Sequence, residues 1–262
     1  MSRRIAFSLL AMLVLSATVI VVAPGPNYAT QDRESPMAGA TRQHWTGTDD
    51  LGRDRTVRVA AALLLCLAGA AAAAAITTAI AAGVGTAAAF SPRPVSSVLM
   101  LVSDLFLTLP WLFLLMIVRS SLPLSASPLH SATTTFLILA ALGWPACARA
   151  VYSGTLDLRS SEWMIQGRAG GLRTGQLIRR HLLPHLQPLL LPQFLLCVPA
   201  FLVAEANLGT LGLGLAEPLP SWGGMLLELD NSAMLARSYW VYLPIALLIF
   251  VLLLLESLTK EV

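Results

Sequence analysis

Six apolar stretches, separated by polar or Gly/Pro-rich segments, dominate the pattern of this chain. Each stretch is about 20 residues long, which is the length that an α-helix needs to cross the hydrocarbon core of a bilayer. The predicted spans are residues 5–23, 59–82, 95–118, 132–151, 182–208 and 239–255. The pattern therefore predicts an all-α membrane protein with about six transmembrane helices.

The segments between the spans define the predicted organisation. Residues 1–23 form a first transmembrane helix, residues 24–58 an external segment, residues 59–257 a transmembrane domain and residues 258–262 a tail. A short loop is predicted at residues 83–94, where glycines and prolines gather. An Arg-rich loop covers residues 153–183, and residues 209–238 form a Gly/Pro-rich, amphipathic segment that does not span.

The first apolar stretch follows two arginines, an arrangement that signal peptides share. Its roughly 19 residues exceed the usual 7–15 of a signal-peptide core and are enough to cross a bilayer. We therefore predict a retained first helix, with a cleaved signal peptide as the alternative.

Composition supports a lipid environment for most of the chain. Hydrophobic residues make up 56% and charged residues only 12%, with a mean hydropathy of +0.73. Soluble domains carry about twice that charged fraction. No basic block is interleaved with aromatic residues, so nucleic acid is not expected as a partner. Cys66, Cys147 and Cys197 lie in apolar segments without metal-ligand spacing, so neither a disulfide nor a zinc site is expected.

The distribution of basic residues predicts the orientation. With an inner N-terminus, ten Lys and Arg residues fall on the inner side and seven on the outer side. The outer arginines mostly neighbour acidic residues. Both termini are therefore predicted to lie in the cytoplasm.

Two acidic residues, Asp104 and Glu205, fall within predicted spans. Acids at membrane depth usually face the bundle interior or a wet cavity. Two hypotheses remain open: the acids bind a cationic part of a solute, or they hydrogen-bond neighbouring helices.

Three blocks of sequence resemble the dipeptide/oligopeptide/nickel family of ABC transporter permeases. The first block is His44–Asp54, between the first two spans. The second combines Glu162, Gly171 and the His181–Pro184 element, in which the glycine lies ten residues before the histidine. The third runs from Ala204 to Leu226. Their order and spacing match the family over most of residues 43–226.

The resemblance implies a type I ABC importer permease fold with a cytoplasmic coupling helix at residues 162–178. In such a fold Gly171 permits a turn between two helical halves, and His181 and Pro184 end the loop and start the fifth span. The residues expected to couple to an ATPase are Glu162, Gln166, Gly167, Arg168, Gly171, Leu172, Arg173, His181 and Pro184.

The chain departs from the general motif where two alanines normally precede the glycine. It has Ile165, Gln166 and Gly167 there, and a bulkier side chain with a looser helix would weaken docking or suit a matched ATPase. Around Trp222, the resemblance implies an outer re-entrant scoop that faces a binding protein. An interfacial aromatic anchor is the alternative.

The implied function is the permease subunit of an ATP-driven importer in the bacterial inner membrane. It carries peptides, metal chelates such as nickel complexes, or a similar small solute by alternating access. The implied partners are a second, different permease chain, two ATP-binding subunits, an external solute-binding protein and membrane lipid. The chain has no GxxxxGK[ST] phosphate loop, so ATP and Mg are expected in the partner subunits, and no cofactor or metal is expected here.

Two other functional classes make different demands on the sequence. An ion-coupled secondary carrier that acts without an ATPase would show an inverted repeat with broken helices in both halves, and none is evident. A membrane-embedded enzyme would need polar catalytic groups converging at one depth, for which Asp104 and Glu205 are the only candidates.

Overall fold

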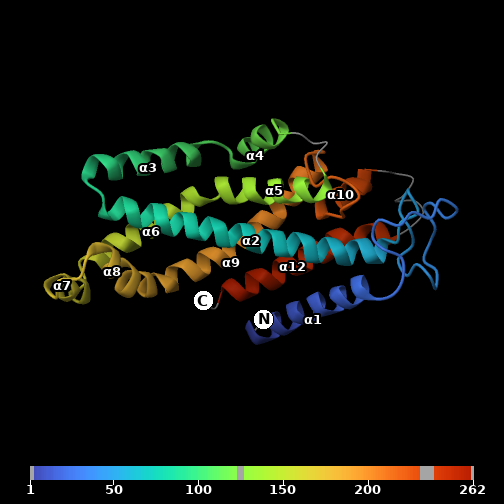
Figure 1. The fold of residues 1–262 in the computed structure, drawn as a ribbon. Coiled ribbons are helices and arrows are strands. Elements are labelled where there is room, and N and C mark those ends of the chain that lie inside the picture. Colours follow the sequence, from blue (N-terminus) through green and yellow to red (C-terminus); the bar gives the residue numbers. More distant parts are fainter. Residues whose placement is uncertain (1–2, 123–126, 231–238, 261–262) are drawn as a thin grey trace.

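The computed structural model describes residues 3–122, 127–230 and 239–260. All secondary-structure elements named within these ranges are helices, and most run roughly parallel in an elongated bundle (Figure 1). Five helical segments are long and apolar enough to span a membrane, and a sixth is a bent pair of shorter helices. These counts refer to the described ranges, and they agree with the six predicted spans.

The five long segments match predicted spans in position and type. They comprise α1 (Arg3–Val22), α2 (Arg55–Phe90), the successive helices α5 (Pro128–Leu142) and α6 (Trp144–Arg159), α9 (Leu183–Thr210), and α12 (Leu243–Thr259). A short 3-10 turn, η3 (Tyr239–Tyr242), precedes α12.

α2 extends further than the sequence predicts. Asp54 caps its first turn by accepting a hydrogen bond from the Val57 N–H at 3.0 Å. The loop predicted at residues 83–94 is wrong, because the helix continues to Phe90. Gly85 has a packing role there: a Cβ at this position would lie 2.7 Å from the carbonyl oxygen of Ala148 on α6. Small residues permit such close helix–helix approach in membranes.

The third predicted span is not one continuous helix. α3 (Arg93–Thr108) and α4 (Trp111–Ser120) meet at 89°. Leu109, immediately before Pro110, adopts an extended conformation. The proline ring favours this conformation because it clashes sterically with a helical preceding residue. The chain therefore turns at Leu109–Pro110.

Unlike Pro110, the prolines of the fifth predicted span do not break its helix. Pro188, Pro192 and Pro199 remain inside a continuous α9, and Pro184 occupies its first turn, where the missing N–H costs no intrahelical hydrogen bond. Neighbouring helices make interior prolines tolerable in spans. The predicted loop at residues 153–183 is also shorter than expected, since α6 continues to Arg159.

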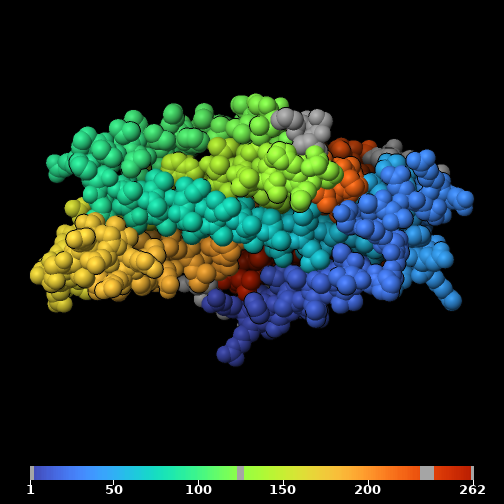
Figure 2. Space-filling model, viewed as in Figure 1, coloured from blue at the N-terminus to red at the C-terminus, as the bar shows by residue number. Residues whose placement is uncertain are grey.

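α2 lies at the centre of the bundle, where it packs against α1, α5, α6 and α9. The main core joins side chains of α2, α5, α9 and α12, among them Leu63, Leu139, Leu202 and Val251. Figures 1 and 2 show two different ends. The loop end is formed by residues 24–54 and α10 (Trp222–Leu227), and the hairpin end by α7 (Glu162–Ala169) and α8 (Thr174–Leu177). The ends of α1 and α12 nearest the chain termini lie part-way along the bundle.

Candidate functional site

The hairpin end is built from two short helices joined by a tight turn. α7 ends in a pair of reverse hydrogen bonds: the Leu172 N–H donates to the Gly167 carbonyl oxygen at 3.1 Å, and the Gly171 N–H donates to that of Arg168 at 3.0 Å. Gly171 has a φ of +79°, in the left-handed region that favours glycine. These features define a Schellman motif. The element predicted over residues 162–178, two helical halves with a turn at Gly171, is present as α7 and α8.

The inner face of the hairpin is tightly packed. Met164 on α7 and Leu177 on α8 are buried. Gly167 faces Leu177 so closely that a Cβ at position 167 would lie 2.6 Å from the Leu177 Cδ2 atom. The glycine that replaces the family's usual alanine therefore admits a buried leucine from α8.

Aromatic contacts attach α7 to the start of α9. The Trp163 ring stacks on the His185 ring with centroids 4.2 Å apart, and His181 lies 6.3 Å from the same indole. The His185 Nδ1 atom lies 2.6 Å from the His181 carbonyl oxygen. A one-turn π-helix, η1 (Ile178–Leu182), leads from α8 into α9. The helical segment is continuous from Thr174 to Thr210, with His181 in η1 and Pro184 in the first turn of α9.

The outer face of the hairpin is polar and positively charged. Glu162, Gln166, Arg168 and Arg173 are exposed, and Leu172 is half-buried beside them. Arg179 and Arg180 follow on η1 and are exposed as well. None of the ion pairs in the described residues includes these four arginines. The hairpin thus presents a cationic surface that can bind an acidic partner.

The two intramembrane acids contact neighbouring helices. Asp104 on α3 forms an ion pair with Arg149 on α6, and both side chains are about half exposed. Glu205 on α9 is fully buried, and its Oε2 atom accepts a hydrogen bond from the Cys66 thiol of α2 at 3.5 Å. The start of α10, at residues 221–223, lies against the same carboxyl group. Each acid therefore joins packed elements, as the helix-bonding hypothesis requires.

At the loop end, a charged network fixes the external segment to the bundle. Arg53 binds Asp49 through its Nε atom at 2.6 Å and Glu217 through its Nη1 atom at 2.5 Å. Arg58 lies 3.5 Å from Asp49 and 3.1 Å from Glu217. Arg55 binds Glu228 at 2.8 Å.

The electrostatics of this network favour the paired state of Arg53. Burial alone would lower the pKa of Arg53, but the hydrogen bonds and negative charges of Asp49 and Glu217 outweigh it and raise the pKa. Burial raises the pKa of Glu228, an effect that the positive charge of Arg55 partly offsets. Glu217 and Glu228, the acids that the segments following α9 bring to this network, were not among the predicted site residues. A signal for them was present, because Glu217 and Glu228 flank a Gly/Pro-rich segment while three arginines gather at residues 53–58.

The segment predicted as a scoop packs inward where it is described. A Cβ at Gly209 on α9 would lie 2.3 Å from the Cα atom of Gly223 on α10. The Trp222 side chain is fully buried in the core. Trp222 is thus neither an interfacial anchor nor a side chain that faces a binding protein. Residues 231–238 of the predicted scoop lie outside the described residues.

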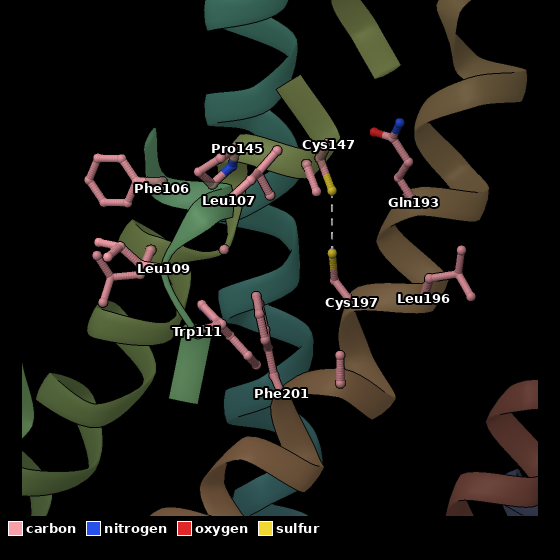
Figure 3. A pocket seen from close by; sticks show the side chains of 14 residues that line it. Phe106, Leu107, Leu109, Trp111, Pro145, Cys147, Gln193, Leu196, Cys197 and Phe201 are labelled. Atoms are coloured by element: carbon pink, nitrogen blue, oxygen red, sulfur yellow. Dashed lines mark hydrogen bonds between the residues drawn. The ribbon is translucent and has the colours of Figure 1, made fainter. Parts of the chain in front are cut away.

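A cavity of about 360 Å³ lies where α3 turns into α4, against α6 and α9 (Figure 3). Aromatic and aliphatic side chains line most of it, including Phe106, Trp111 and Phe201. Cys147 and Cys197 meet across it with their Sγ atoms 3.7 Å apart. The sequence pattern shows these cysteines only as isolated apolar residues, because their approach depends on how α6 packs on α9.

Comparison with known proteins gives a consistent assignment. Residues 79–259 match the family model described as "Binding-protein-dependent transport system inner membrane component". The chain is 28% identical over 227 residues to the oligopeptide transport system permease protein OppC of Bacillus subtilis, covering 86% of this chain and 72% of that protein. It is 29% identical over 252 residues to OppC of Escherichia coli K12, covering 88% of this chain and 76% of that one.

A dipeptide transport system permease protein, DppC of Alkalihalophilus pseudofirmus, is 25% identical over 241 residues, which cover 90% of this chain and 77% of the relative. The chain is also 32% identical over 201 residues to a protein of Brucella suis biovar 1, but it spans only 65% of that protein's length.

Proposed function

The chain belongs to the family of binding-protein-dependent transport system inner membrane components, and from this premise we propose that it is the permease subunit of an ATP-driven peptide importer. The two-helix hairpin at one end of the bundle carries the proposal. It combines a buried inner face, a cationic outer face and direct attachment to α9. The relatives named as oligopeptide and dipeptide permeases support peptides as the solute class.

In this proposal, α7 and α8 form the coupling element that docks on a separate ATP-binding subunit. ATP and Mg belong to that subunit, and the exposed Arg168 and Arg173 face its acidic surface. The hairpin follows α6 and precedes α9 directly in the chain. A push on α7 would therefore reach α9 through Trp163 and His185, and helices can move as rigid bodies when such an element is displaced.

The opposite end of the bundle is proposed to face the external solute-binding protein. Its charged network holds residues 44–58 against Glu217 and Glu228, which gives a docking protein a fixed surface. A second, different permease chain would complete the solute path, and lipid would surround both chains. The hairpin and both termini are assigned to the cytoplasmic side of the inner membrane.

Asp104 and Glu205 have a structural part in this proposal. Their partners, Arg149 and Cys66, come from other helices of the same chain. The proposed solute path therefore does not depend on either carboxylate as a ligand for a cationic solute.

Co-purification in mild detergent tests the coupling assignment. The native chain is expressed with its neighbouring ATP-binding subunits and compared with Gly171→Val, which forces a β-branched residue into the left-handed region. Gly212→Val is the matched control, because Gly212 has a φ of +74° with equally open surroundings, in the segment after α9 that leads to the loop end.

The native chain and Gly212→Val are expected to recover the ATP-binding subunits, whereas Gly171→Val is expected to lose most of them. The amount of folded permease, measured by size-exclusion chromatography, separates lost docking from lost folding. Failure of the native chain to recover any ATP-binding subunit would overturn the proposal. Equal recovery with Gly171→Val would remove the hairpin from the docking site.

A further inference from the structure

The cavity at the bend between α3 and α4 has the construction of a ligand site. Its 360 Å³ lies within the range of small-molecule pockets, and such pockets combine apolar walls with a few polar groups. Five helices contribute: the end of α3, the start of α4, the last residue of α5, the start of α6 and the middle of α9. The chain forms it with helix breaks at Leu109–Pro110 and at Gly143.

Two polar atoms on the walls lack partners within the described residues. The Trp111 Nε1–H is a donor without an acceptor, and the Gln193 Oε1 atom is an acceptor without a donor. Both atoms are inaccessible to solvent, where an unpaired polar group is costly. Figure 3 shows the two side chains on different walls, with Cys147 and Cys197 between them. Because neither atom is exposed in this conformation, each side chain must rotate towards the cavity before it can bond a ligand that supplies one acceptor and one donor.

An amide group offers this combination, with a carbonyl oxygen that accepts and an N–H that donates. The rings of Phe106, Trp111 and Phe201 supply the apolar surface on which a large side chain can pack. The cavity lining contains no charged residue, which favours a neutral group.

We propose that this cavity binds a neutral peptide unit bearing an aromatic or branched apolar side chain, with Trp111 donating to its carbonyl oxygen and Gln193 accepting from its N–H. The inference rests on the proposed function, since it makes the cavity a solute subsite of a peptide permease. It adds a chemical preference to that function. The cavity also borders α6 and α9, the helices that flank the hairpin, so the same movement that follows docking would alter it.

The native cysteines provide the test. The full chain, purified in detergent, is treated with N-ethylmaleimide, and labelling rates at Cys147 and Cys197 are measured by peptide mass spectrometry. Cys66 is the internal reference, because it is fully buried and outside the cavity. The probe is N-acetylphenylalaninamide. N-acetylglycinamide, which lacks the ring, and ethylbenzene, which lacks the amide, are the control compounds.

N-acetylphenylalaninamide is expected to slow labelling of Cys147 and Cys197 at lower concentrations than either control compound. Trp111→Phe and Gln193→Leu each remove one hydrogen-bonding group and are expected to raise the half-protecting concentration by about twofold to tenfold. Gln187→Leu, an exposed position on the same helix outside this cavity, is the matched control and is expected to leave it unchanged.

Three outcomes would overturn the inference: no labelling of either cysteine without ligand, no protection, or equal protection by ethylbenzene. The last of these would indicate a site for lipid or detergent chains. The labelling measurement needs no ATP-binding subunit, so its failure leaves the coupling proposal intact. Protection of the two cysteines without recovery of ATP-binding subunits would instead support the proposed ligand site and contradict the proposed importer function.

Discussion

Gly167 shows how one missing side chain determines the shape of the hairpin. Alanine is better than glycine in a helix interior by about 1 kcal/mol, so propensity alone favours alanine at this position. The buried Leu177 side chain, however, occupies the space that a Cβ would need. Overpacking of a filled interior costs about 1–3 kcal/mol. Packing therefore outweighs propensity here.

Gly167→Ala is accordingly expected to destabilise the hairpin by about 1 kcal/mol, the difference between these opposing terms. The measurement is hydrogen exchange at the Gly171 and Leu172 amides, which bond back to α7. Faster exchange at both is expected, with no change in the core of α2.

Leu177→Ala supplies the control for this residue-level prediction. Combined with Gly167→Ala, it should cost less than the sum of the two single changes, because the loss of the leucine makes room for the alanine methyl group and that methyl group fills part of the cavity. Strict additivity would show that Gly167 and Leu177 do not compete for space.

At the level of elements, the charged network joins the external segment to the first turn of α2. Its members differ greatly in exposure: Arg53 is 5% exposed and Asp49 is 1% exposed, whereas Glu217 is 58% exposed. Removing one partner of a buried ion pair typically costs about 3–5 kcal/mol, whereas exposed pairs contribute about 0–1 kcal/mol. The buried contact of Arg53 with Asp49 is therefore expected to contribute more to stability than its contact with Glu217.

Arg53→Ala is expected to release residues 44–54 from the bundle at a cost of about 3 kcal/mol. Glu217→Gln is expected to cost at most about 1 kcal/mol, because its carboxylate is largely solvated. Limited proteolysis of the external segment, compared with the thermal unfolding of the helices, measures both effects. Equal protease sensitivity of the two variants would contradict the ranking by burial.

The helices of this bundle could be predicted from hydropathy because each is about as long as a bilayer is thick. Hydropathy does not distinguish Gly85, which packs a helix against its neighbour, from a glycine that ends one. It also does not distinguish Pro110, where the chain bends, from Pro192, where α9 continues. Neighbouring helices decide these cases, and a single sequence does not show which helices are neighbours.

The candidate site was likewise predictable only where it depends on local sequence and not on contacts between helices. The turn at Gly171 and the proline in the first turn of α9, Pro184, are local features that follow a familiar spacing. The stack of Trp163 on His185 and the meeting of Cys147 with Cys197 join different helices. Such contacts become visible only when the packing is known.

At the scale of the whole molecule, α2 is long enough to hold the loop end and the hairpin end on opposite sides of a bilayer. Its 36 residues extend for about 54 Å, well beyond the roughly 30 Å of a hydrocarbon core. Charge differs between the ends as well. Arg53, Arg55 and Arg58 at the loop end form ion pairs with acids. The unpaired arginines of the hairpin favour the cytoplasmic side.

Thiol labelling in intact cells tests this orientation. In a chain carrying Cys66→Ala, Cys147→Ser and Cys197→Ser, single cysteines are introduced as Gly39→Cys at the loop end and Gly175→Cys in the hairpin. Both glycines have open surroundings, so neither substitution meets a neighbouring atom. A membrane-impermeant maleimide is expected to label residue 39 in intact cells and residue 175 only after permeabilisation. At both positions an added Cβ meets no atom within 4 Å, and the positions differ in the end that they occupy, so the comparison reports sidedness. The reverse pattern would put the hairpin outside the cell, beyond the reach of ATP-binding subunits, and the coupling mechanism would fail with it.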